Sequence, residues 1–135
     1  MRTLLLVVAM SLVACQSSGN GGNASTSSTT SALENHTLGT GQSVSLPDRS
    51  TLTYVRVVAD SRCRPDVQCI RAGDADIEFK WTPVAGNPLT TALNSDPRNQ
   101  QNAPNSARFG RWQVVLKGLD WEEPPRATLT ISQAD

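Results

Sequence analysis

The eight residues from Asp74 to Trp81 alternate strictly between charged and apolar side chains. In the run DADIEFKW every even-numbered position is charged and every odd-numbered position is apolar. Because successive side chains of a β-strand point to opposite faces of a sheet, this period of two predicts a strand with one buried and one solvated face. The pattern therefore indicates that this part of the chain belongs to a sheet that covers a hydrophobic core.

Other segments carry the same signal. The run 111–117 is apolar at its even positions, and the run 126–132 is apolar at its odd ones. The segment 51–59 is rich in β-branched residues and apolar on both faces, which predicts a central strand. Shorter strands are expected at 42–46 and 89–93.

No segment shows a sustained 3.6-residue period, and Pro and Gly punctuate the gaps between the expected strands. We therefore predict an all-β domain at residues 33–135, either a small antiparallel sandwich or an open barrel of roughly six to seven strands. Two connections, 94–107 and 118–125, are expected to be loops in which function could lie.

The chain begins with a segment typical of an export signal. Arg2 supplies a positive charge before an apolar run at 3–13. That run is too short to span a bilayer core of about 30 Å, but it suits the h-region of a signal peptide. It ends in Leu12-Val13-Ala14-Cys15, a match to the lipobox of bacterial lipoproteins, which the chain resembles.

This resemblance implies both a lipid anchor and a location in the cell envelope. Residues 1–14 would be cleaved, and Cys15 would carry several acyl chains that hold the protein on a membrane. Gln16 follows, where Asp tends to retain such proteins at the inner membrane, so we expect an outer-membrane protein that faces the periplasm. The rest of 15–32 is mostly Ser, Thr, Gly and Asn, which predicts a disordered tether with a span of roughly 23 Å.

With Cys15 assigned to lipid, Cys63 and Cys69 remain. In an oxidising compartment such a lone pair predicts a disulfide, which contributes about 2.3 kcal/mol on the chain-entropy model. The alternative, a metal site, lacks further Cys or His ligands, and no calcium-loop spacing occurs. No metal and no cofactor is predicted.

The segment from Asp60 to Gly73 resembles one in small uncharacterised bacterial lipoproteins, of the form D-S-R-C-P-x-x-V-x-C-x-W-A-G. The matching residues are Asp60, Ser61, Arg62, Cys63, Val67, Cys69, Ala72 and Gly73. Two positions depart, because Arg64 stands in place of Pro and Arg71 in place of Trp. That family has no established activity, so the resemblance implies a fold and a compartment but no reaction.

Arg62, Arg64 and Arg71 are candidate binding residues. Three guanidinium groups in one closed loop are suited to contact an anion or a carboxylate. The alternative is that they pair with the carboxylates interleaved among them. Those carboxylates belong to Asp60, Asp66, Asp74 and Asp76.

Trp121 is the fourth candidate binding residue. It lies among acids and prolines in the loop 118–125, where an exposed indole would be an interaction anchor. Alternatively, it folds back and caps an edge of the sandwich. Trp81 and Trp112 fall on the apolar faces of expected strands, which places them in the core.

Catalysis has little support in the sequence. The only histidine, His36, is expected to be exposed, and no second His or free Cys completes a nucleophilic triad, so no catalytic residue is predicted. Asp120, Glu122 and Glu123 are the acids that an enzyme would use. Basic and acidic residues number 12 each, which gives no case for nucleic-acid binding.

The leading hypothesis is therefore a non-enzymatic binding or accessory domain, held at the membrane by its lipid anchor, with an envelope protein or a glycan as partner. One alternative is a small hydrolase or sugar-active enzyme that uses the acids of 118–125. The other is an inhibitor of a foreign or host enzyme. An inhibitor would need a rigid protruding loop, for which 118–125 is the first candidate and 63–69 the second.

Overall fold

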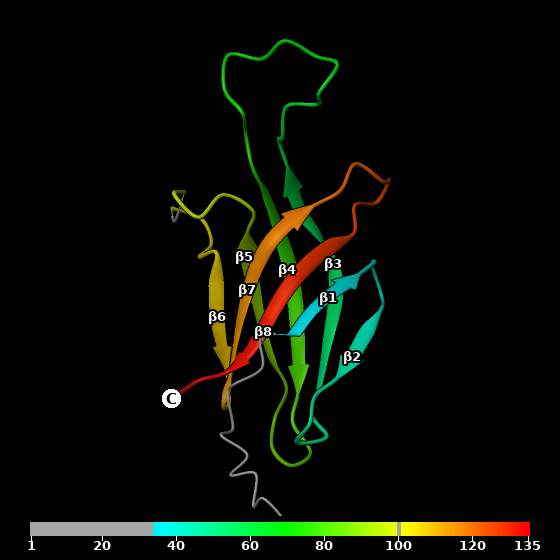
Figure 1. Cartoon of the computed structure of the whole chain (residues 1–135), viewed down its shortest axis with the longest axis vertical. Coiled ribbons are helices and arrows are strands. Elements are labelled where there is room, and N and C mark those ends of the chain that lie inside the picture. The colour runs from blue at the N-terminus through cyan, green and yellow to red at the C-terminus, as the bar shows by residue number, and fades with distance from the viewer. Residues whose placement is uncertain (1–33, 100) are drawn as a thin grey trace, which may run out of the picture.

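A computed structural model describes residues 34–99 and 101–135 and gives them an all-β fold (Figure 1). The expected signal peptide, the lipobox with Cys15 and the tether lie outside the described residues. The strands are β1 (Glu34–Leu38), β2 (Ser43–Ser45), β3 (Thr51–Asp60), β4 (Ala75–Thr82), β5 (Leu89–Asn94), β6 (Ser106–Phe109), β7 (Trp112–Leu119) and β8 (Ala127–Gln133). No helix occurs in the described ranges.

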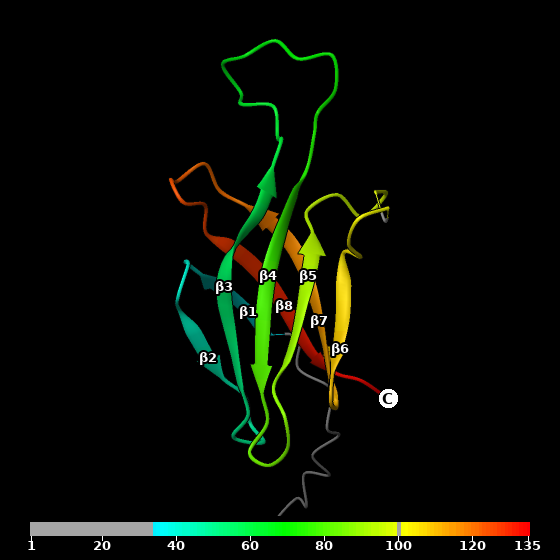
Figure 2. The same cartoon turned by 180° about the vertical axis from the view of Figure 1, so that it is seen from behind.

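The strands form two four-stranded antiparallel sheets. One has the order β1-β8-β7-β6 and the other the order β2-β3-β4-β5 (Figures 1 and 2). The all-β prediction is confirmed, and β3 lies inside its sheet as expected. The expected count of six to seven strands is wrong, because the structure has eight. The two unpredicted strands, β1 and β6, are the edges of the first sheet.

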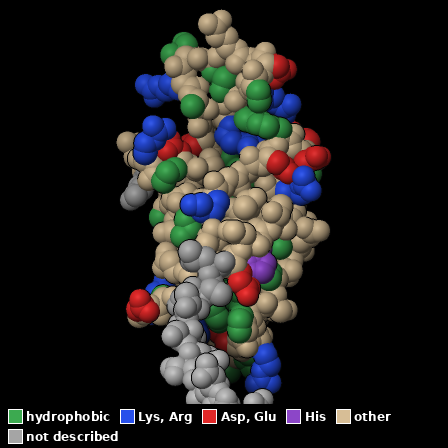
Figure 3. All heavy atoms as spheres, in the orientation of Figure 1, with side chains coloured by type: hydrophobic (Ala, Val, Ile, Leu, Met, Phe, Trp, Pro, Cys, Tyr) green, Lys and Arg blue, Asp and Glu red, His purple; other side chains and the backbone are tan. Residues whose placement is uncertain are grey.

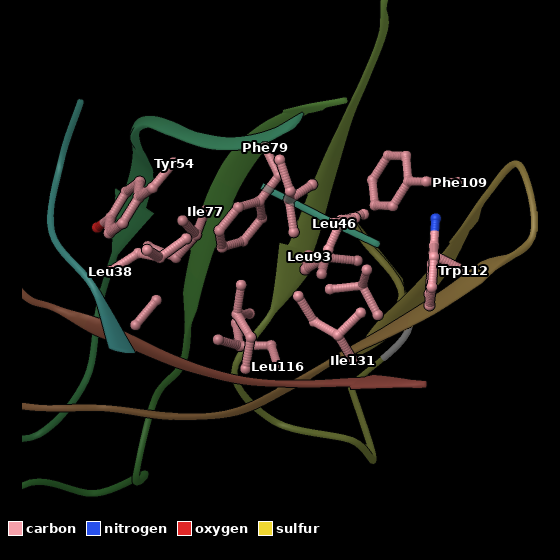
Figure 4. Close-up of a cluster of buried hydrophobic side chains, with 14 residues drawn as sticks. Leu38, Leu46, Tyr54, Ile77, Phe79, Leu93, Phe109, Trp112, Leu116 and Ile131 are labelled. Carbon is pink, nitrogen blue, oxygen red and sulfur yellow. The ribbon is translucent and has the colours of Figure 1, made fainter. Parts of the chain in front are cut away.

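The two sheets enclose one hydrophobic core to which both contribute side chains (Figure 4). β4 turns Ala75, Ile77 and Phe79 inward, and all three are buried, as the alternation predicts. The even positions of β7 and the odd positions of β8 are buried in the same way. Trp112 belongs to this core, and Trp81 packs against it.

Two side-chain hydrogen bonds also join the sheets. The hydroxyl of Tyr54, a buried residue of β3, donates to the carbonyl of Pro125 in the β7–β8 connection at 2.9 Å. The indole Nε1 of Trp112 on β7 donates to Oδ2 of Asp48 in the β2–β3 connection at 2.8 Å. The other oxygen of Asp48 accepts from the amide and the hydroxyl of Ser50.

The β3–β4, β5–β6 and β7–β8 connections gather at one end of the domain, and the β3–β4 loop reaches farthest (Figures 1 and 2). We call this the loop end: residues 61–74, 95–99, 101–105 and 120–126. Leu38 pairs with Ala127 next to it, whereas Glu34 pairs with Ile131. The described chain therefore starts on the side of the sheet away from the loop end. No helix in this part of the chain is long and apolar enough to cross a membrane.

Candidate binding site at the loop end

The β3–β4 loop is closed by the disulfide that the sequence predicts. The Sγ atoms of Cys63 and Cys69 are 2.12 Å apart. At the base of the loop the amide of Ser61 donates to the carbonyl of Asp74 at 2.8 Å, and the amide of Cys63 donates to the carbonyl of Ala72 at 2.7 Å. The antiparallel pairing of β3 and β4 thus continues into the loop and fixes its direction.

Gly73 is required at this base. Its φ is +67°, and a Cβ there would lie 1.9 Å from the carbonyl oxygen of Ser61, so only glycine fits without displacing backbone. At the far end of the loop Val67 is 52% exposed and Ile70 is completely exposed. The loop therefore combines a fixed base with an apolar tip. In Figure 3 charged and hydrophobic side chains gather together over the loop end.

Arg62 joins the β3–β4 loop to the end of β7. Its Nε and Nη2 donate to the carboxylate of Asp60 at 2.8–3.1 Å. Its Nη1 donates to the backbone carbonyls of Leu119 and Asp120 at 3.3 and 2.9 Å. The side chain is only 11% exposed. Because these bonds use most of its N–H groups, Arg62 positions two loops against each other.

Trp121 lies on the guanidinium of Arg62. The Cζ of Arg62 is 4.3 Å from the centroid of the indole ring, which is cation–π geometry. Trp121 is nonetheless 47% exposed. Arg62 also lines the hollows that border the indole. The indole is thus an exposed anchor held in one orientation, rather than a cap buried against a sheet edge.

The other two candidate arginines have different surroundings. Nη2 of Arg64 donates to Glu123 at 3.0 Å, and both side chains are largely exposed. Arg71 is exposed, and its guanidinium forms no ion pair or hydrogen bond with any residue that the structure describes. Of the expected pairings with interleaved aspartates, the structure forms only that between Arg62 and Asp60.

The carboxylates of Asp74 and Asp76 are engaged by amide groups. Nδ2 of Asn94 donates to Asp76 at 2.8 Å and to Asp74 at 3.2 Å, and Nδ2 of Asn99 also donates to Asp74. Asn94 is fully buried. These bonds fasten the β5–β6 loop to the start of β4. Local sequence patterns do not predict them, because the partners are 18–25 residues apart.

Two adjoining hollows extend from Trp121 across the base of the disulfide loop. The first, of about 390 Å³, is lined on its walls by Trp121, Leu119 and the β5–β6 loop. The second, of about 470 Å³, continues past Arg71 and Asn99. Both share Ala72, Gly73, Asp96 and Arg98, so we treat them as one groove. A third hollow of about 150 Å³ lies between Trp121, Arg64 and Glu123.

The acids of 118–125 do not resemble a catalytic pair. Burial opposes ionisation of Asp120, but hydrogen bonds from the amide and guanidinium of Arg126 and from the amide of Glu122 outweigh it and lower the pKa of its carboxyl. A general acid needs a raised pKa. Asp120 therefore shapes the β7–β8 loop, while Glu122 and Glu123 point to solvent with exposed side chains.

The remaining candidates for metal ligands or a base are the His, Cys, Asp and Glu side chains. In the described ranges no group of three or more His, Cys, Asp or Glu side chains is arranged to hold a metal ion. His36 lies on β1, where it pairs with Leu129 of β8, and its Nε2 is 3.3 Å from Glu34. Its side chain is 25% exposed rather than freely exposed as expected.

No protein-family model matches the sequence, and no curated protein or solved structure matches the chain.

Proposed function

We propose that this chain is a lipid-anchored envelope protein whose domain binds an envelope protein or a glycan at its loop end, without catalysing a reaction. The lipobox ending in Cys15 supports the anchor, and Gln16 supports an outer-membrane address facing the periplasm. The binding role rests on the geometry of the loop end.

The observation that carries the binding role is the position of Trp121. An indole that is 47% exposed, held on one face by Arg62 and bordered on two sides by hollows, is a preorganised anchor. Preorganisation matters because association otherwise has to offset the ordering of mobile side chains. Tryptophan and arginine are also enriched among the residues that dominate binding energies.

The position of the lipid anchor fits a binding role for the loop end. An N-terminal lipid would reach the domain through Glu34, which lies on the side of the sheet away from the loop end. The loop end would then face away from the membrane surface. A tether of roughly 17 residues would let this face sample partners at some distance from the headgroups.

The binding proposal is tested by retention of immobilised domain variants on fractionated envelope: outer-membrane vesicles, cell-wall polysaccharide and envelope proteins. We expect the wild-type domain to retain material from one fraction. Trp121→Ala should abolish this retention, whereas Val84→Ala, at an exposed apolar position of the opposite end, should not. Equal retention by both variants would reject the loop end as the binding face.

The lipid anchor is tested separately by mass spectrometry of the full chain made in a bacterial host. The proposal predicts an N-terminus at Cys15 that carries acyl chains, and a soluble exported product for Cys15→Ser. An unmodified Cys15 in the exported protein would contradict the anchor without affecting the binding role.

A second candidate function, the inhibitor, is favoured by one observation. The loop that protrudes is the β3–β4 loop, the second of the two inhibitor candidates (Figure 2). It presents the exposed side chains of Val67 and Ile70. A loop closed by a disulfide is already ordered, so its apolar tip could enter the cleft of another protein with little ordering cost. Ile70→Asp would then abolish capture of a protein, whereas Trp121→Ala would weaken it less.

A further inference from the structure

We infer that the groove between Trp121 and Arg71 binds a saccharide that carries a carboxylate. This inference rests on the proposed function and names the chemical class of ligand for the same face. In this arrangement a pyranose ring stacks on the open face of Trp121, and its chain continues over the base of the disulfide loop. The carboxylate of the ligand meets the guanidinium groups of Arg71 and Arg98.

The first argument is the shape of the groove. Its two parts, of about 390 and 470 Å³, each fall in the range of about 300–1,000 Å³ typical of small-ligand sites. Ala72 and Gly73 are common to both parts and have little or no side chain. Because a Cβ at Gly73 would collide with Ser61, this open floor is built into the backbone.

The second argument is that one face of the Trp121 ring is covered by Arg62. Arg62 occupies one face of Trp121, so a ligand stacks on one side only. An aromatic platform with a single open face suits the apolar C–H face of a pyranose, whose hydroxyl groups then point sideways to polar neighbours. Ser95 and Asn99 line the groove and provide such neighbours.

The third argument comes from the hydrogen-bond partners of the charged groups. Both oxygens of Asp96 accept from Arg98, and both oxygens of Asp74 accept from Ser61 or from asparagine amides. The carboxylates of the groove are thus already engaged within the chain. Arg98 keeps an unused donor, because only its Nε and Nη2 bond to Asp96.

Arg71 supplies the largest unused donor set. Its guanidinium lines the groove, and within the described residues no hydrogen bond or ion pair engages it. A guanidinium binds a carboxylate through two parallel N–H donors. A groove whose carboxylates are satisfied, while Arg71 and Arg98 keep unused N–H donors, favours an acceptor-rich anionic ligand over a cationic or purely apolar one.

The test is titration calorimetry of the domain with three acidic probes: a galacturonate trisaccharide, a hyaluronan tetrasaccharide and the disaccharide of N-acetylglucosamine and N-acetylmuramic acid. Each is paired with its methyl ester, which removes the charge and keeps the sugar. We expect at least one acid to bind and its ester to bind at least about tenfold more weakly, equivalent to about 1.4 kcal/mol.

Two variants locate the site. Arg71→Gln should weaken binding of the acid by about tenfold and leave binding of the ester unchanged. The variant should fold, because the guanidinium of Arg71 makes no hydrogen bond or ion pair with the described residues. Trp121→Ala should weaken both the acid and the ester. Lys80→Gln, at an exposed basic position of β4, and Val84→Ala are the matched controls and should change neither.

The outcomes separate this inference from the proposed function. Equal binding of acid and ester, or insensitivity to Arg71→Gln, would overturn the carboxylate contact. If none of the acids binds while the domain still retains an envelope protein through Trp121, the inference fails and the proposed function stands. If none of the acids binds and the domain also retains nothing, both fail.

Discussion

The guanidinium of Arg62 lies 4.3 Å from the centroid of the indole ring of Trp121 while it donates hydrogen bonds to the carbonyls of Leu119 and Asp120, the two residues before that tryptophan. One side chain of the β3–β4 loop thus fixes both the backbone and the ring of the β7–β8 loop. The exposed anchor of the proposed site depends on an arginine that is itself nearly buried.

Removing Arg62 should therefore destabilise the domain more than removing an exposed arginine. We expect Arg62→Ala to lower the free energy of unfolding by about 2–3 kcal/mol, because Asp60 and two carbonyls lose charged donors in a partly buried site. Arg56→Ala is the control, since Arg56 makes a similar fork to Glu78 but is exposed, and its loss should cost below about 1 kcal/mol. Urea unfolding measures both; equal losses would contradict the role given to Arg62.

Gly73→Ala should disturb the domain far more than Gly41→Ala. Both glycines have positive φ, +67° and +79°, so both alanines are strained by about 1 kcal/mol. Only at Gly73 does the new Cβ collide with backbone, 1.9 Å from the carbonyl oxygen of Ser61. We expect a lower melting temperature for Gly73→Ala and amide chemical-shift changes across 61–74. Similar melting temperatures for the two variants would show that the loop base adapts.

Acid should weaken the link between the sheets at Asp48. Burial opposes ionisation there, but hydrogen bonds from Ser50 and Trp112 outweigh it and hold the pKa of the carboxyl below its ordinary value of 3.8. A lowered folded-state pKa contributes stability that is present above the unfolded-state value and is lost as the pH falls through the folded-state value.

The free energy of unfolding should therefore fall as the pH drops below about 4, and it should fall less steeply in Asp48→Asn. Asp60, Asp96 and Asp120 also have lowered pKa values, so the variant should keep part of the slope. Denaturant unfolding between pH 2 and 6 gives the comparison. Identical slopes in the two proteins would mean that Asp48 does not contribute.

Loss of the Cys63–Cys69 disulfide should loosen the β3–β4 loop and spare the core. The double variant Cys63→Ser, Cys69→Ser should lose about 2 kcal/mol of stability, since the closed loop is short. None of the core residues belongs to that loop, so the far-ultraviolet circular dichroism spectrum should stay that of a β protein. A spectrum typical of an unfolded chain would contradict this separation of loop and core.

The sequence revealed the strands that bury the most side chains and missed two edge strands. β4, β7 and β8 bury apolar residues at every second position, so their apolar period is visible in the sequence. β4 departs from strict alternation at Asp76, which is buried although the pattern predicts a solvated position. β1 and β6 each bury only one residue, Leu38 and Phe109 respectively, and are held mainly by pairing with β8 and β7. Edge strands of this kind leave little hydrophobic pattern to find.

The candidate site was predictable in its parts but not in its assembly. The residues alone predict the disulfide and single out Trp121, but they leave open whether that indole is exposed or folded back. The contacts of Arg62 with Leu119 and Asp120, and of Arg64 with Glu123, join residues 57–59 positions apart in the chain. Local spacing carries no information about such pairs, because they depend on how the two sheets meet. The groove likewise exists only once the β5–β6 loop lies against the disulfide loop.

The central claim is that the loop end is the face that binds. Hydrogen–deuterium exchange of the domain, with and without the envelope fraction that it retains, tests this most directly. The account predicts slower exchange on binding at 61–73, 95–99 and 118–126, with the opposite connections at 83–88 and 110–111 unchanged. Protection confined to those opposite connections, or to the outer faces of the sheets, would contradict it.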